Sequence, residues 1–266
     1  MLRDILLKTL HDQRRGLLAW TVSLVLLVAM YAALWPSIRD QPSMSQFLQN
    51  MPEAMRALFA SSGADMSTPT GYVQVELLSF MGPMLLLIYA ITTGAAGVAG
   101  EEDRHTLELL MANPVSRTRV VLEKFGALVV GTALLGLATG LALVLEGRLA
   151  GLDLPVGNVA AAMLHLTLLA LVFGALAAAI GGLTGHGGAS RAIPAVVAVV
   201  AYVLNGLAPV VSWLKPAQKF SPFFQYLGHD PLRNGISAPA ILTAVVTVAV
   251  LVVVAVLGFR RRDLAG

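Results

Sequence analysis

The residues best suited to chemistry or recognition lie in one charged run, GEEDRHTLELLMANPVSRTRVVLEK, from Gly100 to Lys124. Three acidic residues stand near its start, where a helix is predicted to begin, so their charge suits the positive end of the helix dipole. The stretch 106–112 is rich in good helix formers and places apolar side chains on one face. These apolar residues are Leu107, Leu110 and Met111.

The sequence also predicts where this helix ends. Asn113-Pro114 should terminate it, because a residue that precedes proline avoids the helical region. Ser116 then caps a second helix. We expect an apolar stripe surrounded by a charged rim, which is typical of a docking element for a soluble partner. The rim residues are Glu101, Glu102, Asp103, Arg104 and Glu108.

Other chemistries have little support. The chain has no Cys, and its five His residues show no metal-ligand spacing. No Lys follows a Gly, so a phosphate-binding Gly-Lys-Ser/Thr loop is absent and we expect no bound cofactor in this chain. The net charge of +3 is too small to indicate a nucleic-acid partner.

The elements that hold the charged run are apolar. The 266 residues are 57% hydrophobic and 12% charged, whereas soluble domains carry roughly 25% charged residues. A bilayer core of ~30 Å takes about 20 helical residues. The sequence therefore predicts a single all-α membrane domain over 1–266 with six spans. They are expected at about 17–36, 77–99, 125–146, 158–183, 192–213 and 238–259.

The Lys and Arg residues indicate the orientation of these spans. Twelve of the eighteen flank one side and six flank the other. Because positive charge favours the cytoplasmic side, both termini and the charged run should be cytoplasmic. Residues 1–16 predict an amphipathic helix in the membrane interface. A long polar loop, 37–76, should lie outside.

The charged run resembles the cytoplasmic signature of ABC-2 type permeases. The matching pattern is Glu101, then Thr106-Leu107-Glu108-Leu109-Leu110, then Pro114-Val115-Ser116-Arg117. In that family this segment, here about 100–118, forms a coupling helix that enters a groove of an ATPase subunit. The resemblance also covers six spans, the outer loop after the first span, and KFSPFFQYLGHDPLRNG before the last. This last stretch forms short re-entrant helices in relatives, and Pro222, Pro231 and Gly235 would divide it.

The resemblance implies a subunit of an ATP-driven exporter in the bacterial plasma (inner) membrane. Its partners would be two cytoplasmic ATPase subunits, which bind ATP and Mg, and a second permease copy or paralogue. The substrate would be hydrophobic or amphipathic, such as a drug, an antibiotic or a lipid-like molecule. Glu76, His165 and Asn205 are the candidates for the substrate path, although each also fits an ordinary packing or interfacial role.

Two other functions remain open. A free-standing secondary transporter is possible, but such proteins usually carry ionisable residues at mid-membrane, and these span centres hold almost none. A membrane scaffold that docks a partner without transporting anything would use the same charged run. An intramembrane protease is disfavoured because Thr106 stands where a Glu-Glu-x-x-x-Arg motif needs arginine.

Overall fold

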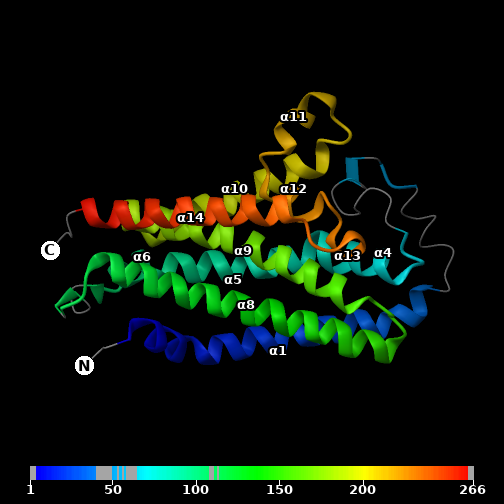
Figure 1. The fold of residues 1–266 in the computed structure, drawn as a ribbon, viewed down its shortest axis with the longest axis horizontal. Coiled ribbons are helices and arrows are strands. Elements are labelled where there is room, and N and C mark those ends of the chain that lie inside the picture. The colour runs from blue at the N-terminus through cyan, green and yellow to red at the C-terminus, as the bar shows by residue number, and fades with distance from the viewer. Residues whose placement is uncertain are drawn as a thin grey trace.

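The computed structural model of the protein describes residues 4–39, 50–52, 54–55, 57, 65–107, 111–112 and 114–262. Within these ranges it contains helices and no strand. Six helices are long and apolar enough to cross a membrane, and they lie side by side along the long axis (Figure 1). The prediction of an all-helical protein with six spans is therefore confirmed. We call the end of the bundle where α1 starts and α14 finishes the termini end, and the opposite end the far end.

The bounds of the long helices differ in places from the expected ones. The second span is continuous from Pro69 to Gly97 and begins earlier than expected, because Thr68 caps it and Pro69 occupies its first turn. The six candidate spans are α1 (Ile5–Arg39), α4 with η1 and α5 (Pro69–Val73, Gln74–Met81, Gly82–Gly97), α8 (Arg117–Ala150), α9 (Val156–Thr184), α10 (Gly187–Leu207) and α14 (Ala238–Arg261).

Helix α1 contains both the expected interfacial helix and the first span. It runs for 35 residues without a break, which corresponds to about 52 Å. The stretch before Pro36 holds a single glycine, Gly16, and one glycine does not end a helix. The sequence therefore predicted a boundary near residue 16 that the backbone does not have.

Helix α9 forms the centre of the bundle. It packs against α5, α8, α10 and α14, and two thirds of its apolar window is buried. Helices α1 and α14 are far less buried and present apolar side chains to the surroundings. The core therefore consists of α9 and the faces turned toward it.

Glycines allow α9 to approach its neighbours closely. A Cβ on Gly94 of α5 would lie 2.3 Å from the carbonyl oxygen of Gly174, and one on Gly182 would lie 2.5 Å from that of Ala255. Neither position has room for a side chain. Small residues thus allow close helix packing in this chain.

A π-helical segment, η1, precedes Pro83 within the second span. Proline lacks an N–H donor and clashes with the carbonyl four residues earlier in a regular α-helix. The wider π-helical turn supplies a different hydrogen-bond register just before this proline. The helix thus continues through Gly82-Pro83 into α5.

The far end carries four short helices between α10 and α14 (Figure 1). Pro222 and Pro231 each stand in the first turn of one of them, and Gly235 follows the last with a φ of 75°. The chain is divided at the three expected residues, while the re-entry of these helices into a membrane stays a prediction. The four short helices are η2 (Ser212–Leu214), α11 (Lys215–Gln218), α12 (Pro222–Leu227) and α13 (Pro231–Asn234).

Candidate functional site

The charged run starts with a short helix, α6 (Ala99–Asp103), which carries Glu101 and Glu102 in its first turn. His105 follows with a φ of 56°, in the left-handed region, so the chain turns sharply there. At the other end of the run, Ser116 Oγ accepts a hydrogen bond from the Arg119 N–H at 3.2 Å and caps α8. This cap was predicted from the sequence.

Leu107 lies inside the protein. Its side chain is 3% exposed and belongs to a buried apolar cluster with Val98, Val120 and Phe259 among others. The expected role of Leu107 as a docking anchor therefore does not fit this structure, because its apolar surface is already covered by the chain itself. It fastens the run to the bundle instead.

Glu101 connects the run to α8. Its carboxylate forms an ion pair with Lys124 and accepts a hydrogen bond from the Thr106 hydroxyl at 2.5 Å. Burial raises the pKa of Glu101, but the hydrogen bonds from Lys124 and Thr106 outweigh it and hold the pKa below its ordinary value. The carboxylate is therefore charged and fixed at neutral pH.

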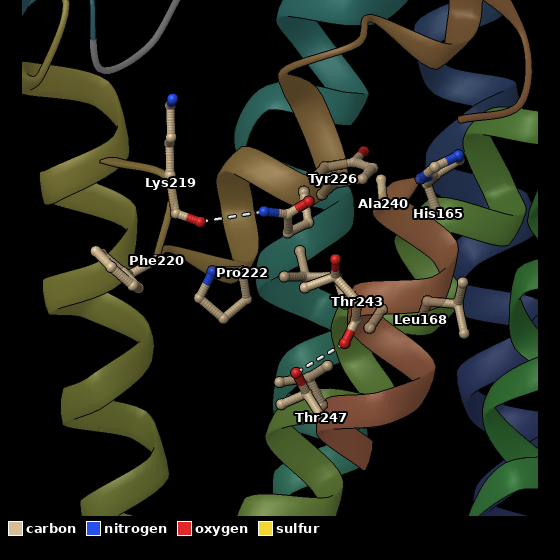
Figure 2. A pocket seen from close by; sticks show the side chains of 13 residues that line it. His165, Leu168, Lys219, Phe220, Pro222, Tyr226, Ala240, Thr243 and Thr247 are labelled. Carbon is tan, nitrogen blue, oxygen red and sulfur yellow. Dashed lines mark hydrogen bonds between the residues drawn. The ribbon is translucent and has the colours of Figure 1, made fainter. Parts of the chain in front are cut away.

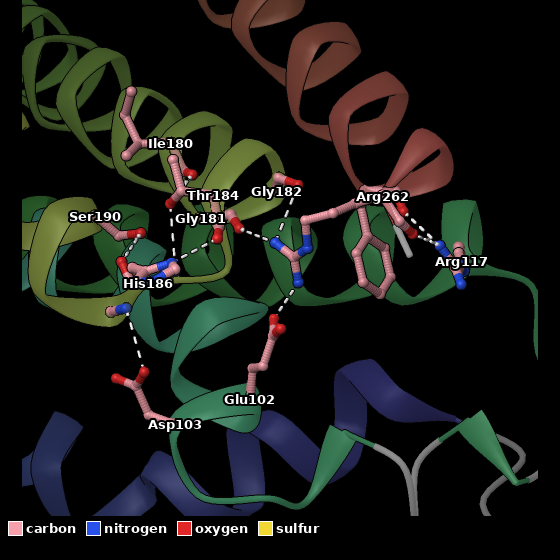
Figure 3. Close-up of polar contacts among 12 residues, drawn as sticks. Glu102, Asp103, Arg117, Ile180, Gly181, Gly182, Thr184, His186, Ser190 and Arg262 are labelled. Carbon is pink, nitrogen blue, oxygen red and sulfur yellow. Dashed lines mark hydrogen bonds and ion pairs between the residues drawn. The ribbon is translucent and has the colours of Figure 1, made fainter. Parts of the chain in front are cut away.

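Glu102 connects the run to the last described residue of the chain. It pairs with the Arg262 guanidinium, which also donates to the Gly181 carbonyl oxygen at 3.1 Å (Figure 3). One arginine thus bridges α6, the end of α9 and the end of α14. Basic side chains at helix C-termini are favourable because the last carbonyls are otherwise unpaired.

Asp103 connects the run to the start of α10. Its Oδ1 accepts a hydrogen bond from the Gly187 N–H at 3.3 Å (Figure 3). Its Oδ2 lies 3.8 Å from the Arg191 guanidinium. A carboxylate at a helix N-terminus compensates the unpaired N–H groups there. Glu101, Glu102 and Asp103 are thus all engaged within the chain.

Arg117 joins α8 to the end of α14. It donates to the Phe259 carbonyl oxygen at 2.9 Å and to that of Arg262, and it lies 5.4 Å from the centre of the Phe259 ring. The termini end is thus a set of ionic and hydrogen-bonded contacts between α6 and the ends of α8, α9, α10 and α14. We call this set the ionic cluster.

The remaining expected docking residues have mixed positions. Arg104 and Pro114 are exposed, and Met111 is half-buried against the cluster that holds Leu107. Glu108 and Leu110 lie outside the described residues. Among the docking residues that the structure describes, Asp103, Arg104 and Pro114 are therefore exposed and Met111 is partly exposed.

The three candidates for the substrate path lie in different surroundings. Glu76 is half-buried in η1 and lines a cavity of about 10 Å³ with Tyr31 and Tyr72, which has room for about one water. Asn205 lies in the last turn of α10, because this helix ends at Leu207 and not near residue 213 as expected. Its backbone oxygen accepts a hydrogen bond from Gln218 at 3.1 Å.

His165 lines a larger pocket of about 230 Å³ between α9, α12 and α14 at the far end (Figure 2). Its Nε2 accepts a hydrogen bond from the Ser237 N–H at 3.2 Å. Lys219 and Gln225 also line the pocket, and Gln225 donates to the Lys219 carbonyl oxygen. The imidazole thereby holds the start of α14 against α9, which is a packing role.

Sequence reasoning missed the basic partners of the three acids. Lys124, Arg191 and Arg262 were counted only as charges that set the orientation. The signal was present in the sequence, because each stands at a span end that the orientation places beside Glu101, Glu102 and Asp103. Among the described residues, no group of His, Asp and Glu could hold a metal ion.

The chain was compared with protein families and with curated proteins. Residues 8–260 match the family described as "Multidrug efflux system permease Rv1217c, C-terminal domain". No curated protein matches the chain. The match covers nearly the whole sequence and agrees with the ABC-2 type signature in the charged run. The chain therefore belongs to the family of the Rv1217c multidrug efflux permease C-terminal domain.

Proposed function

We propose that this chain is the membrane-spanning subunit of an ATP-driven exporter and that a separate ATPase docks at its termini end. The ionic cluster is the observation that carries this proposal. It ties the charged run to four helix ends, so a force applied to the run reaches α8, α9, α10 and α14 directly. A loop that only set the orientation would need no such connections.

The docking surface is the part of the run that the chain leaves open. Arg104, Met111 and Pro114 contribute to it, and the sequence pattern adds Glu108 and Leu110, which lie outside the described residues, as further expected contacts. Leu107 and the three acids hold this surface in place. Apolar anchors dominate such contacts, commonly with about 2 kcal/mol or more each, so Met111 and Leu110 should carry most of the affinity.

Two permease subunits and two ATPase subunits would form the complete exporter. Each chain offers one charged run, and cassette ATPases act in pairs that enclose two ATP molecules with Mg. The energy source would thus lie outside this chain. The apolar, glycine-packed spans favour a hydrophobic or amphipathic substrate, as the name of the matched family also suggests.

Association with the ATPase tests the proposal. We would co-express the chain with the cassette ATPase that we expect in a neighbouring reading frame and measure co-purification. Met111→Asp should abolish the complex, because it places a charge in the apolar contact. Arg15→Glu serves as the control, since it changes an exposed charge at the same end outside the run. Wild-type association of Met111→Asp and Leu110→Asp would refute docking through this surface.

The orientation needs its own test. The chain has no native Cys, so single introduced cysteines can be labelled selectively. A membrane-impermeant maleimide should label Arg15→Cys only from the cytoplasmic side and Lys215→Cys only from the outer side. The opposite pattern would place the termini end outside and exclude a cytoplasmic ATPase there.

A further inference from the structure

A pocket of about 410 Å³ lies at the termini end between α1, α5, α6 and α8. It is separate from the far-end pocket that His165 lines. Asp12, Gly16 and Arg104 in its wall are exposed, so the pocket is open to the surface. Its volume falls within the usual range for small-molecule sites.

The α1 side of the pocket presents hydrogen-bond acceptors. Asp12 contributes a carboxylate, and Gln13 contributes an amide whose Oε1 is buried. Among the described residues, no donor lies within hydrogen-bond distance of Gln13 Oε1. A buried acceptor without a partner is unfavourable, so this position favours a ligand that brings an N–H group.

The opposite side of the pocket is positive. Arg104 and Lys124 both line it, and Glu101 between them offsets one of their two charges. The pocket therefore has a negative, acceptor-rich wall on α1 and a net positive wall on α6 and α8. A simple cation would meet Arg104, and a simple anion would meet Asp12 and the Gln13 oxygen.

The inner wall of the pocket is aromatic. Trp20 and Tyr89 line it, with ring centres 6.1 Å apart and ring planes at 71°. Leu17 lies beside them. Trp and Tyr are typical of the depth at which lipid headgroups meet the hydrocarbon region. The site thus combines two opposite charges with an apolar interior at the end of the spans.

We propose that this pocket binds the headgroup of an aminophospholipid-type amphiphile, which carries a primary ammonium and a phosphate. The ammonium donates to Asp12 and Gln13 Oε1, and the phosphate pairs with Arg104. The acyl chains leave along Leu17 and Trp20. The surrounding bilayer supplies such molecules, which is why a lipid rather than a soluble zwitterion is the expected occupant.

The pocket also touches the charged run, because Glu101 and Arg104 belong to both. Under the proposed function, a bound headgroup would therefore contact the segment that couples to the ATPase. Binding itself does not require an ATPase, so it can be measured on the permease alone. Its failure would leave the proposed function standing.

Tryptophan fluorescence provides the measurement. The chain has three Trp residues, and Trp35→Phe with Trp213→Phe leaves Trp20 as the only reporter. We would reconstitute this variant in phosphatidylcholine vesicles that contain increasing fractions of one brominated lipid, which quenches nearby Trp. Brominated phosphatidylethanolamine should quench at a concentration at least about threefold lower than brominated phosphatidylcholine, which has no N–H to donate.

Substitutions then locate the effect. Asp12→Asn and Gln13→Leu should each bring quenching by brominated phosphatidylethanolamine close to the level seen with brominated phosphatidylcholine. The control is Asp153→Asn, which changes an exposed acid at the far end and should leave the preference for phosphatidylethanolamine unchanged. Equal quenching by the two lipids in the reporter protein would overturn the proposal without any further variant. Stronger quenching by brominated phosphatidylglycerol than by phosphatidylethanolamine would also overturn it, because it would indicate a simple anion site.

Discussion

The two ends of the bundle are joined by different kinds of contact. At the termini end, carboxylates and guanidinium groups connect the helix ends, and several of these side chains are partly exposed. At the far end, the ion pair between Arg233 and Asp230 is local to α13, and neutral groups connect separate elements. The Tyr226 hydroxyl donates to the Leu78 carbonyl oxygen at 3.0 Å, and the Ser221 hydroxyl donates to that of Ala201 at 2.8 Å. Both of these far-end bonds are buried.

This difference separates an adjustable end from a fixed end. Partly exposed ion pairs are weak in water and are screened by salt, so a partner with its own charges can rearrange them. A buried neutral hydrogen bond has no competing solvent and is costly to leave unmade. The termini end is therefore suited to respond to a docking protein, and the far end is suited to keep its shape.

The largest expected effect concerns the close contact between α5 and α9. Gly94→Leu should destabilise the protein by about 3 kcal/mol, because the new side chain would overlap the Gly174 carbonyl. Gly157→Leu is the matched control, since a Cβ there meets nothing within 4 Å. Thermal unfolding in detergent measures both. If the two variants unfolded at the same temperature, the α5–α9 crossing would not be the close contact described.

The next effect tests the fixed end. Tyr226→Phe should lower the free energy of unfolding by about 1–2 kcal/mol, because it leaves the buried Leu78 carbonyl oxygen without its hydroxyl donor. The loss should be the same at low and high salt. A loss that shrank strongly with added salt would contradict the assignment of the far end to neutral contacts.

The third effect tests the adjustable end. Arg262→Gln should lower the free energy of unfolding by about 1 kcal/mol, because it leaves Glu102 without its charged partner and removes the donors to the carbonyl groups at the end of α9. Here the difference from wild type should shrink as salt is added. Arg261→Gln, at an exposed neighbour, should change little. Faster amide exchange in 99–107 of the Arg262 variant would report the released charged run directly.

The smallest effect is a pH dependence of the ionic cluster. The folded-state pKa of Glu101 lies below its ordinary value, so its contribution is present at neutral pH and is lost as the pH falls through the folded pKa. The difference in unfolding free energy between Glu101→Gln and wild type should therefore shrink as the pH is lowered below about 4, because the ordinary Glu pKa is about 4.3. A constant difference over this range would show that Glu101 does not titrate as described.

The sequence predicted the all-helical fold with six spans well because long apolar blocks are a strong signal. It also predicted Ser116 as a helix cap and the three residues that divide the far-end helices. The burial of Leu107 was not predictable in this way. An apolar stripe has the same pattern whether it faces the chain's own bundle or a partner, and only the position of Phe259 and Val120 decides between them.

The position of Asn205 illustrates a second limit. Hydropathy continues past Leu207 through Val210 and Val211, so the pattern extended the fifth span beyond the actual end of α10. The partners of the three acids were missed for a different reason. Glu102 and Arg262 are 160 positions apart, so no local pattern links them. The only signal for the pair was the predicted orientation, which places both residues at the same end of the bundle.

The first turn of α1 has a consequence for how the protein is made. Glu123 of α8 accepts hydrogen bonds from the N–H groups of Ile5 and Leu6, at 2.6 and 3.1 Å. These partners are 118 and 117 residues apart, so the first helix leaves the ribosome long before Glu123 is synthesised. The Asp4 carboxylate accepts a hydrogen bond from the Leu7 N–H at 3.1 Å, so the start of α1 has one local cap from the beginning. During translation, the N–H groups of Ile5 and Leu6 must wait for Glu123, and the cap is completed only when the third span has been inserted beside α1.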